Sequence, residues 1–238
     1  MSPSTKVFFK TCISFSLLFF YSNSWAQPDP IGAFNKHIVE NWGGDYTRIG
    51  PYHVKGSPYF LGQSFLGVAE YRGGNKDSRS KILYNLYNQK AGIEVNKELF
   101  ETDSLLEKFE LLLPETLGDK SLHFKNGMYY GLPKTDGYFN VLAEGDKVSF
   151  LKQYKTRLIA DPTNTLSRDD KVFEQYFEYY VYNNASKVLH KIKLRQKDIL
   201  KELADDPMAK NYIVKNDIDV SKEGDAIQLI NKYNNSFK

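Results

Sequence analysis

The chain has 238 residues, with 32 Lys and Arg against 29 Asp and Glu, and its compositional excess is aromatic, with 17 Tyr and 16 Phe. A nucleic-acid-binding protein usually carries a strong basic excess or a basic stripe. The charges show neither, so we expect no nucleic-acid partner.

The N-terminal segment, residues 1–26, has the pattern of a secretory signal peptide. Lys6 and Lys10 precede a short apolar run, no acidic residue is present, and small residues stand at Ser24 and Ala26. A membrane-spanning helix needs about 20 apolar residues, so a retained membrane anchor is the less favoured alternative. We predict cleavage after Ala26 and a location in the periplasm, at the cell surface or outside the cell.

Cleavage there would remove the single cysteine, Cys12, and two lysines, which leaves 30 basic residues against 29 acidic ones. The mature chain would be cysteine-free, without a disulfide, a thiolate nucleophile or a cysteine metal ligand. Cys12 precedes most of the apolar run, whereas a lipid-anchored cysteine follows it, so we expect no lipid anchor. About 210 mature residues suffice for a sizeable core.

Residues 27–56 are rich in Gly, Pro, Asn and Asp and predict a loosely structured lead-in, with one short helix near Phe34–Val39. A β domain is predicted over residues 57–193, because strand-sized runs bounded by turn residues follow one another at short spacing. The predicted strands are 65–71, 82–88, 93–99, 108–113, 121–124, 128–132, 138–145, 147–159, 173–183 and 186–192.

The predicted connections set the expected topology. Residues 72–80 read as a loop, 89–92 as a tight turn, and Asn126-Gly127 as a hairpin turn. Parallel neighbours need a crossover of a dozen or more residues, and no long helix separates these runs. We therefore predict a mainly β (α+β) fold, an antiparallel sheet of about eight to ten strands arranged as a sandwich or an open barrel.

The apolar spacing changes at about residue 194, and residues 194–238 predict two or three short amphipathic helices. One covers 195–206, a second begins at Pro207 with Asp205 or Asp206 as its cap, and a third begins at Ser221 or Asp225. Short amphipathic helices need a partner surface. We expect this helical element to pack on the sheet.

The sequence offers no clear catalytic, cofactor-binding or metal-binding motif. The four histidines, of which His123 and His190 lie in predicted strands, lack the i, i+4 spacing of a helical metal site. No Gly-x-Ser-x-Gly nucleophile motif is present. Glu174 and Glu178 would lie about 13 Å apart along one strand, too far for a glycosidase pair.

The aromatic strand 173–183 has two different faces. One reads as core, and the other mixes glutamates with Tyr176, Tyr180 and Tyr182. Exposed tyrosines can stack on sugars or hold peptides, although cross-strand aromatic pairs also simply stabilise sheets. We take these three tyrosines as the candidate binding surface.

The run 82–88 has apolar residues on both of its faces. It therefore predicts a central strand that is covered on both sides.

Several stretches resemble an uncharacterised family of exported proteins of Bacteroidota. They are the opening GSPYF at 56–60, the strand LYNLYN at 83–88, and the C-terminal runs 197–200, 212–216 and 227–234. The strand departs from the family at Leu83-Tyr84, where Leu-Arg is frequent. The resemblance implies export and a sheet followed by helices, and it carries no activity and no site residues.

These patterns favour a non-enzymatic, envelope-associated protein, a binding or structural module whose partner is a glycan, a peptide or another envelope protein. We expect no cofactor, and no membrane span once the signal peptide is removed. Two alternatives stay open: a hydrolase acting on envelope polymers or glycans, and an outer-membrane β-barrel. A pocket that gathers a histidine with carboxylates would favour the hydrolase.

Overall fold

The computed structural model describes residues 47–49, 52–95, 98–101, 106–118, 120–133, 136–163 and 170–236. All of them belong to one compact unit, Gly43–Lys238. The predicted signal peptide, its cleavage site and the expected helix near Phe34–Val39 lie outside the described residues.

In the part of the chain that the structure describes, twelve strands form one sheet. Along the sheet the order is β1-β2-β11-β10-β9-β8-β7-β3-β4-β5-β6, with β12 also paired to β11. The strands are β1 Thr47–Ile49, β2 Tyr52–Lys55, β3 Phe65–Tyr71, β4 Lys76–Asn85, β5 Lys90–Val95, β6 Glu98–Glu101, β7 Leu106–Leu112, β8 Ser121–Asn126, β9 Tyr138–Glu144, β10 Val148–Ala160, β11 Asp170–Asn183 and β12 Val188–Ile192.

The predicted fold class, mainly β with short C-terminal helices, is confirmed. The sheet is open, because its first and last strands in that order, β1 and β6, do not pair with each other. It is also mixed, since β2 runs parallel to the beginning of β11 while the other pairs are antiparallel. The prediction of a purely antiparallel sheet assumed that neighbouring strands are joined by short connections. It was wrong for this one pair because β2 and β11 are far apart in the sequence.

Four local predictions need correction. The hairpin between β4 and β5 turns at residues 86–89, not 89–92, because Asn85 pairs with Lys90. β4 begins at Lys76, inside the predicted loop 72–80, and the predicted strand 93–99 is divided between β5 and β6. The predicted strand 128–132 is instead the 3₁₀ helix η3, Gly127–Tyr130, whose cap Asn126 accepts a hydrogen bond from the Met128 amide.

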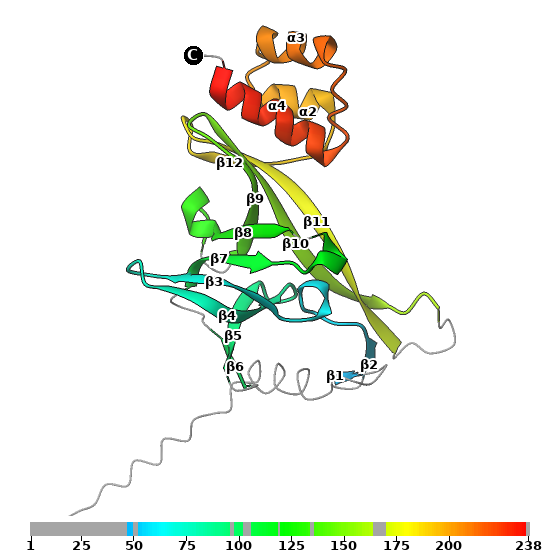
Figure 1. The fold of residues 1–238 in the computed structure, drawn as a ribbon. Helices are drawn as coiled ribbons and strands as arrows, with labels where there is room; N and C mark the ends of the chain where they lie inside the picture. The colour runs from blue at the N-terminus through cyan, green and yellow to red at the C-terminus, as the bar shows by residue number, and fades with distance from the viewer. Residues whose placement is uncertain are drawn as a thin grey trace, which may run out of the picture. The chain divides into compact units, whose positions relative to one another are not determined.

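The sheet curls (Figure 1). Its main core cluster draws aromatic side chains from β3, β4, β7, β8 and β9. Backbone and side-chain hydrogen bonds join the β4–β5 turn to β10: Thr156 N donates to Leu86 O at 3.2 Å, and Gln89 Nε2 donates to Tyr154 O at 3.0 Å. Within the core, the rings of Phe109 and Phe124 stack at 4.7 Å. Each such aromatic pair contributes about 0.5–1.5 kcal/mol beyond its burial.

The predicted central strand is covered on both faces at its C-terminal end. Ile82, Tyr84 and Leu86 are buried in the core, and Leu83 is only 6% exposed on the other side. Tyr87, which follows in the turn, is 48% exposed.

Three helices follow the last strand: α2 Gln196–Glu202, α3 Pro207–Lys215 and α4 Glu223–Ser236. They lie at the ends of β9 to β12, away from β2 (Figure 1). Asp206 caps α3 by accepting from the Met208 amide at 2.7 Å, and Pro207 opens the helix as the sequence predicts. The helices share a second core with the sheet, in which Ile199, Leu229 and Phe150 are fully buried.

Candidate functional site

A cavity of about 530 Å³ opens on the face of the sheet formed by β10, β11 and β12. We call it the β10–β12 cavity. Its size lies within the range of about 300–1,000 Å³ found for small-molecule sites. It is lined by Gln89, Leu132, Asp136, Phe139, Gln153, Lys155, Tyr180, Leu189 and Lys191.

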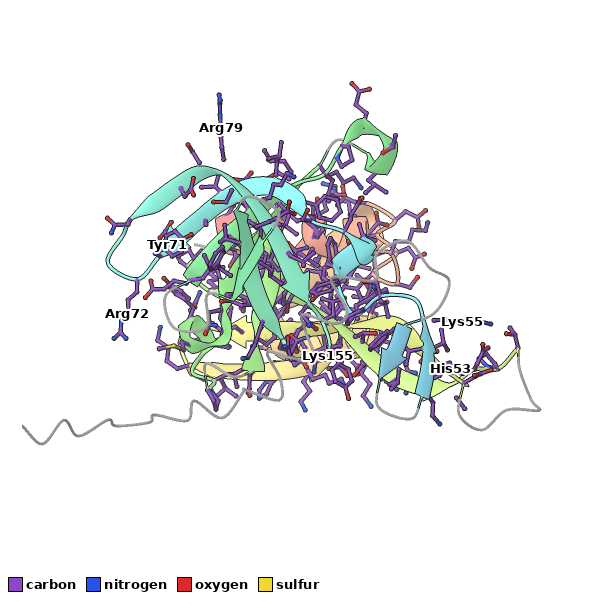
Figure 2. All side chains as sticks on the ribbon, turned by 90° about the horizontal axis from the view of Figure 1, so that it is seen from below. His53, Lys55, Tyr71, Arg72, Arg79 and Lys155 are labelled. Atoms are coloured by element: carbon purple, nitrogen blue, oxygen red, sulfur yellow. The ribbon has the colours of Figure 1, made fainter. Side chains whose placement is uncertain are left out.

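Strand register explains why these side chains meet. Directly opposite residues of neighbouring strands share a face, and Gln153 pairs with Glu178 while Tyr180 pairs with Lys191. Side chains two residues apart on one strand also share a face, which adds Lys155. Lys155 is labelled in Figure 2, where it lies on the long strands. Three strands therefore supply Gln153, Lys155, Tyr180 and Lys191, whereas Gln89 and Asp136 come from the connections before β5 and β9.

The base of the cavity is a buried amide network. Gln153, which is 3% exposed, donates to Asp136 O at 2.6 Å and to Gln89 Oε1 at 3.2 Å. Gln89 Nε2 donates to Leu86 O at 2.8 Å, and the Tyr84 hydroxyl donates to Gln89 Oε1 at 2.8 Å. Because these groups hold one another, the base is pre-formed before any ligand arrives.

A carboxylate, Glu178, anchors the polar wall. It accepts hydrogen bonds from Lys155 at 2.9 Å, from the Tyr180 hydroxyl at 2.7 Å and from Lys191. Burial raises the pKa of Glu178, but the bonds from Lys191, Tyr180 and Lys155 outweigh it and lower the pKa to about 2. Glu178 therefore stays ionised near neutral pH, and a general acid or base needs a pKa close to the working pH.

The remaining groups balance the charge. The ammonium groups of Lys155 and Lys191 both pair with Glu178, which lies next to the lining, and Asp136 adds a second carboxylate within the lining. Burial, and then the hydrogen bond to Glu178, raise the pKa of Tyr180, so its phenol stays protonated. The opposite wall is apolar and consists of Leu132, Phe139 and Leu189. The cavity thus offers hydrogen-bond donors, acceptors and an apolar wall without a net charge.

The three tyrosines of the predicted binding surface do not form one exposed row. Tyr182 is 7% exposed and packs its ring 5.3 Å from that of Tyr130 in η3, so it cannot offer a face to a ligand. Tyr180 is half-buried against Phe139 and lines the cavity. Tyr176 is 36% exposed, outside the cavity, with the Arg157 guanidinium 5.5 Å from its ring.

The prediction that the other face of β11 belongs to the core is also only partly correct. Phe173 and Val181 are buried, but Phe177 is 51% exposed. Sequence reasoning missed the lysines and glutamines of the cavity. Side chains alternate between the two faces of a strand, so the sequence shows that Gln153 shares a face with Lys155, and Leu189 with Lys191. It does not show that these two pairs meet, because that depends on the strand register.

A second cavity, of about 370 Å³, lies over β3, β7, β8 and β9, and we call it the β7–β8 cavity. It holds one of the histidines beside carboxylates. His123 Nδ1 lies 4.0 Å from Glu110 Oε2 and its Nε2 lies 3.4 Å from Ser121 Oγ. Lys108 and Glu70 form an ion pair at 2.6 Å on the same wall.

The residues Ser, His and Glu are those of a hydrolase triad, but their hydrogen bonds differ from those of a triad. Ser121 Oγ donates to Glu110, and its contact with His123 Nε2 is long, at 3.4 Å. A nucleophilic serine must instead pass its proton to the histidine. The His123 side chain is 61% exposed, so water has free access to it. This arrangement supports a polar surface cluster better than an activated nucleophile.

The described residues contain no group of three or more His, Cys, Asp or Glu that could hold a metal ion. No helix in the described part of the chain has the length and apolar character needed to cross a membrane. Comparisons with protein-family models, curated proteins and solved structures find no match for this chain. Function is therefore argued from the two cavities themselves.

Proposed function

We propose that this chain is an exported, envelope-associated binding protein that holds a neutral saccharide unit in the β10–β12 cavity without reacting with it. The observation that carries the proposal is the lining of that cavity, in which Lys155, Lys191 and Asp136 lie beside an apolar wall. Glu178, next to the lining, pairs with both lysines and brings the charge of these four groups to zero. The proposal of export rests on the signal-peptide pattern of residues 1–26 and on the resemblance to exported proteins of Bacteroidota.

The chemistry of a sugar matches this lining. Sugar hydroxyls need both donors and acceptors, and the C–H face of the ring packs on apolar or aromatic side chains. Lys155 and Lys191 donate, Asp136 accepts, and Phe139 and Leu189 form the apolar side. A strongly anionic or cationic ligand would lack a compensating net charge.

The proposal of binding without catalysis follows from the state of Glu178. Its pKa of about 2 keeps it deprotonated, and three donors already occupy it. It therefore serves as a fixed acceptor that orients the two lysines.

Isothermal titration calorimetry with cellobiose, maltose and N,N′-diacetylchitobiose tests the proposal, with digalacturonic acid as the charged comparison. We expect saturable binding of at least one neutral disaccharide and weaker binding of the acidic one. Lys155→Met should weaken binding about tenfold, because a hydrogen bond from a charged group contributes about 1.5–3 kcal/mol. Lys191 still holds Glu178 in that variant, so the fold should persist.

Lys215→Met, on an exposed position of α3, is the matched control and should bind like the wild-type protein. Preference for the acidic disaccharide, or equal binding by the Lys155→Met variant, would refute the neutral-saccharide proposal. So would the absence of saturable binding to every sugar in the panel.

A hydrolase acting on envelope polymers or glycans is the second candidate, favoured by the Ser121, His123 and Glu110 cluster of the β7–β8 cavity. We expect no turnover of p-nitrophenyl acetate or of isolated peptidoglycan above the level of the Ser121→Ala variant. Turnover that disappears in Ser121→Ala and in His123→Ala would establish the hydrolase instead.

A further inference from the structure

The middle of β11 has one backbone edge that no described strand covers. β10 pairs with β11 from Lys171 to Asn183. On the opposite edge, β2 pairs only with Asp170–Val172, and β12 pairs only with Tyr179–Asn183. The six residues between them, Phe173–Glu178, form what we call the open stretch of β11.

The open stretch behaves as an edge along its second half. Gln175, Tyr176 and Phe177 are three consecutive exposed residues, although their side chains alternate between the two faces of the sheet. The chain that follows β2 meets only the first half, where the side chain of Gln175 donates to Tyr59 O at 2.8 Å. Among the described residues, no backbone hydrogen bond outside the β10 pairing reaches this stretch.

The open stretch is also recessed. β2 and β12 both occupy the row next to β11, one at each end of the gap, and strands in a sheet are about 4.8 Å apart. Figure 2 shows His53 and Lys55 of β2 at one end of the long strands. The sheet edge of a second copy is too broad to enter this gap. Because the chain after β2 already lies beside Phe173 and Gln175, a single extended chain of three or four residues, about 10–13 Å long, fits the remaining half.

The two faces beside the open stretch differ in chemistry. On one face, the exposed ring of Phe177 lies 6.5 Å from Tyr154 and 5.4 Å from Tyr179. This aromatic surface also holds the Lys152 ammonium, 4.2 Å from the Phe177 ring centroid. On the other face, the cations of Arg157, Lys155 and Lys191 stand against the carboxylates of Glu174 and Glu178. These five residues of β10, β11 and β12 carry one more positive than negative charge.

We propose that the open stretch of β11 binds an extended peptide strand that is apolar on the Phe177 face and acidic on the opposite face. The peptide would complete the row between β2 and β12 by main-chain hydrogen bonds to β11, as in other cases of strand addition. Aromatic contact on one face and the excess positive charge on the other supply its side-chain preference. This site lies beside the saccharide cavity and shares Lys155 and Lys191 with it, but it goes beyond the function proposed for that cavity.

Hydrogen–deuterium exchange of the full chain gives the first test. Amides of the open stretch that point away from β10 should exchange faster than the corresponding amides of Tyr179–Asn183, because β12 covers only the latter. Equally slow exchange in both stretches would show that the edge is already covered and would overturn the proposal.

Fluorescence polarisation with a labelled, end-blocked tetrapeptide of alternating valine and glutamate gives the second test. We expect saturable binding with a Kd below about 1 mM. Two isomers, methylated on the valine nitrogens or on the glutamate nitrogens, are the matched controls, because alternate N–H groups of a strand point to opposite edges. One isomer should lose at least about tenfold in affinity, and the other should bind like the parent peptide.

The remaining outcomes each decide against the proposal. Equal binding by both isomers would show attachment through side chains alone. Absence of saturation at about 1 mM would show that the edge accepts no such strand. Concentration-dependent dimerisation that a Tyr176→Ala and Phe177→Ala double variant removes would identify a second copy as the occupant.

Discussion

Replacing Asn234 of α4 by alanine tests how the helical element is joined to the sheet. Asn234 is 7% exposed, and its side-chain amide faces the first residue of β10. Val148 N donates to Asn234 Oδ1 at 3.1 Å, and Asn234 Nδ2 donates to Val148 O at 3.0 Å. One side chain thus replaces a strand neighbour for both backbone groups of Val148.

Alanine would leave a buried backbone donor and a buried acceptor without partners. Each unsatisfied group costs about 1–3 kcal/mol, so the free energy of unfolding should fall by about 2–6 kcal/mol. In a domain of 150–250 residues, 1 kcal/mol corresponds to about 2–4 °C in Tm. Urea denaturation followed by circular dichroism, together with calorimetry, measures both quantities. Asn235→Ala, at the exposed neighbouring position, should leave them nearly unchanged.

A substitution at Gly145 tests the same contact between Asn234 and the sheet in a second way. A Cβ at this position would collide with the side chain of Asn234. Gly145→Ala should therefore destabilise the protein alone and cost less when added to Asn234→Ala, because the Cγ and Nδ2 atoms that it meets are then gone and only the Cβ of residue 234 remains. Equal stability of Asn234→Ala and Asn235→Ala, or strict additivity in the double variant, would refute the proposed junction.

Three further predictions follow from the packing and the charges. Truncation after Lys193 should lower the Tm or make the protein insoluble in a thermal-shift and solubility assay, because it exposes the apolar residues of the sheet that the helices cover. Tyr182→Ala should lower the free energy of unfolding by about 3 kcal/mol in urea denaturation, since its ring is buried, whereas Tyr176→Ala should cost far less. The stability contributed by Glu178, whose pKa falls from 4.5 to about 2, should be present above pH 4.5 and disappear as the pH falls towards 2.

Each of these predictions has a result that contradicts it. An unchanged Tm after truncation would show that the helices fold apart from the sheet. Equal losses for Tyr182→Ala and Tyr176→Ala would contradict the burial of Tyr182. When the free energy of unfolding is measured as a function of pH, the Glu178→Gln variant should lose less of it between pH 4.5 and 2 than the wild-type protein does. The same loss in both proteins would show that ionised Glu178 does not stabilise the fold.

The local elements follow largely from the sequence by itself. Alternating apolar residues bounded by turn residues identified β3, β7 and β9 to β12 to within a few residues. Asp206 and Pro207 marked the start of α3, because a side-chain cap and a fixed φ act within one helical turn. These signals work because the interactions behind them join residues close together along the chain.

The candidate sites depend on contacts that no local pattern contains. Lys155 and Lys191 meet on Glu178 only because the β10–β11 and β11–β12 registers place them on one face. Tyr182 resembles Tyr176 in the sequence, but η3 covers only Tyr182. The parallel pairing of β2 with β11, which bounds the open stretch, joins Lys55 to Val172. Such pairs are set by which surfaces bury each other when the chain collapses, so only the tertiary structure decides them.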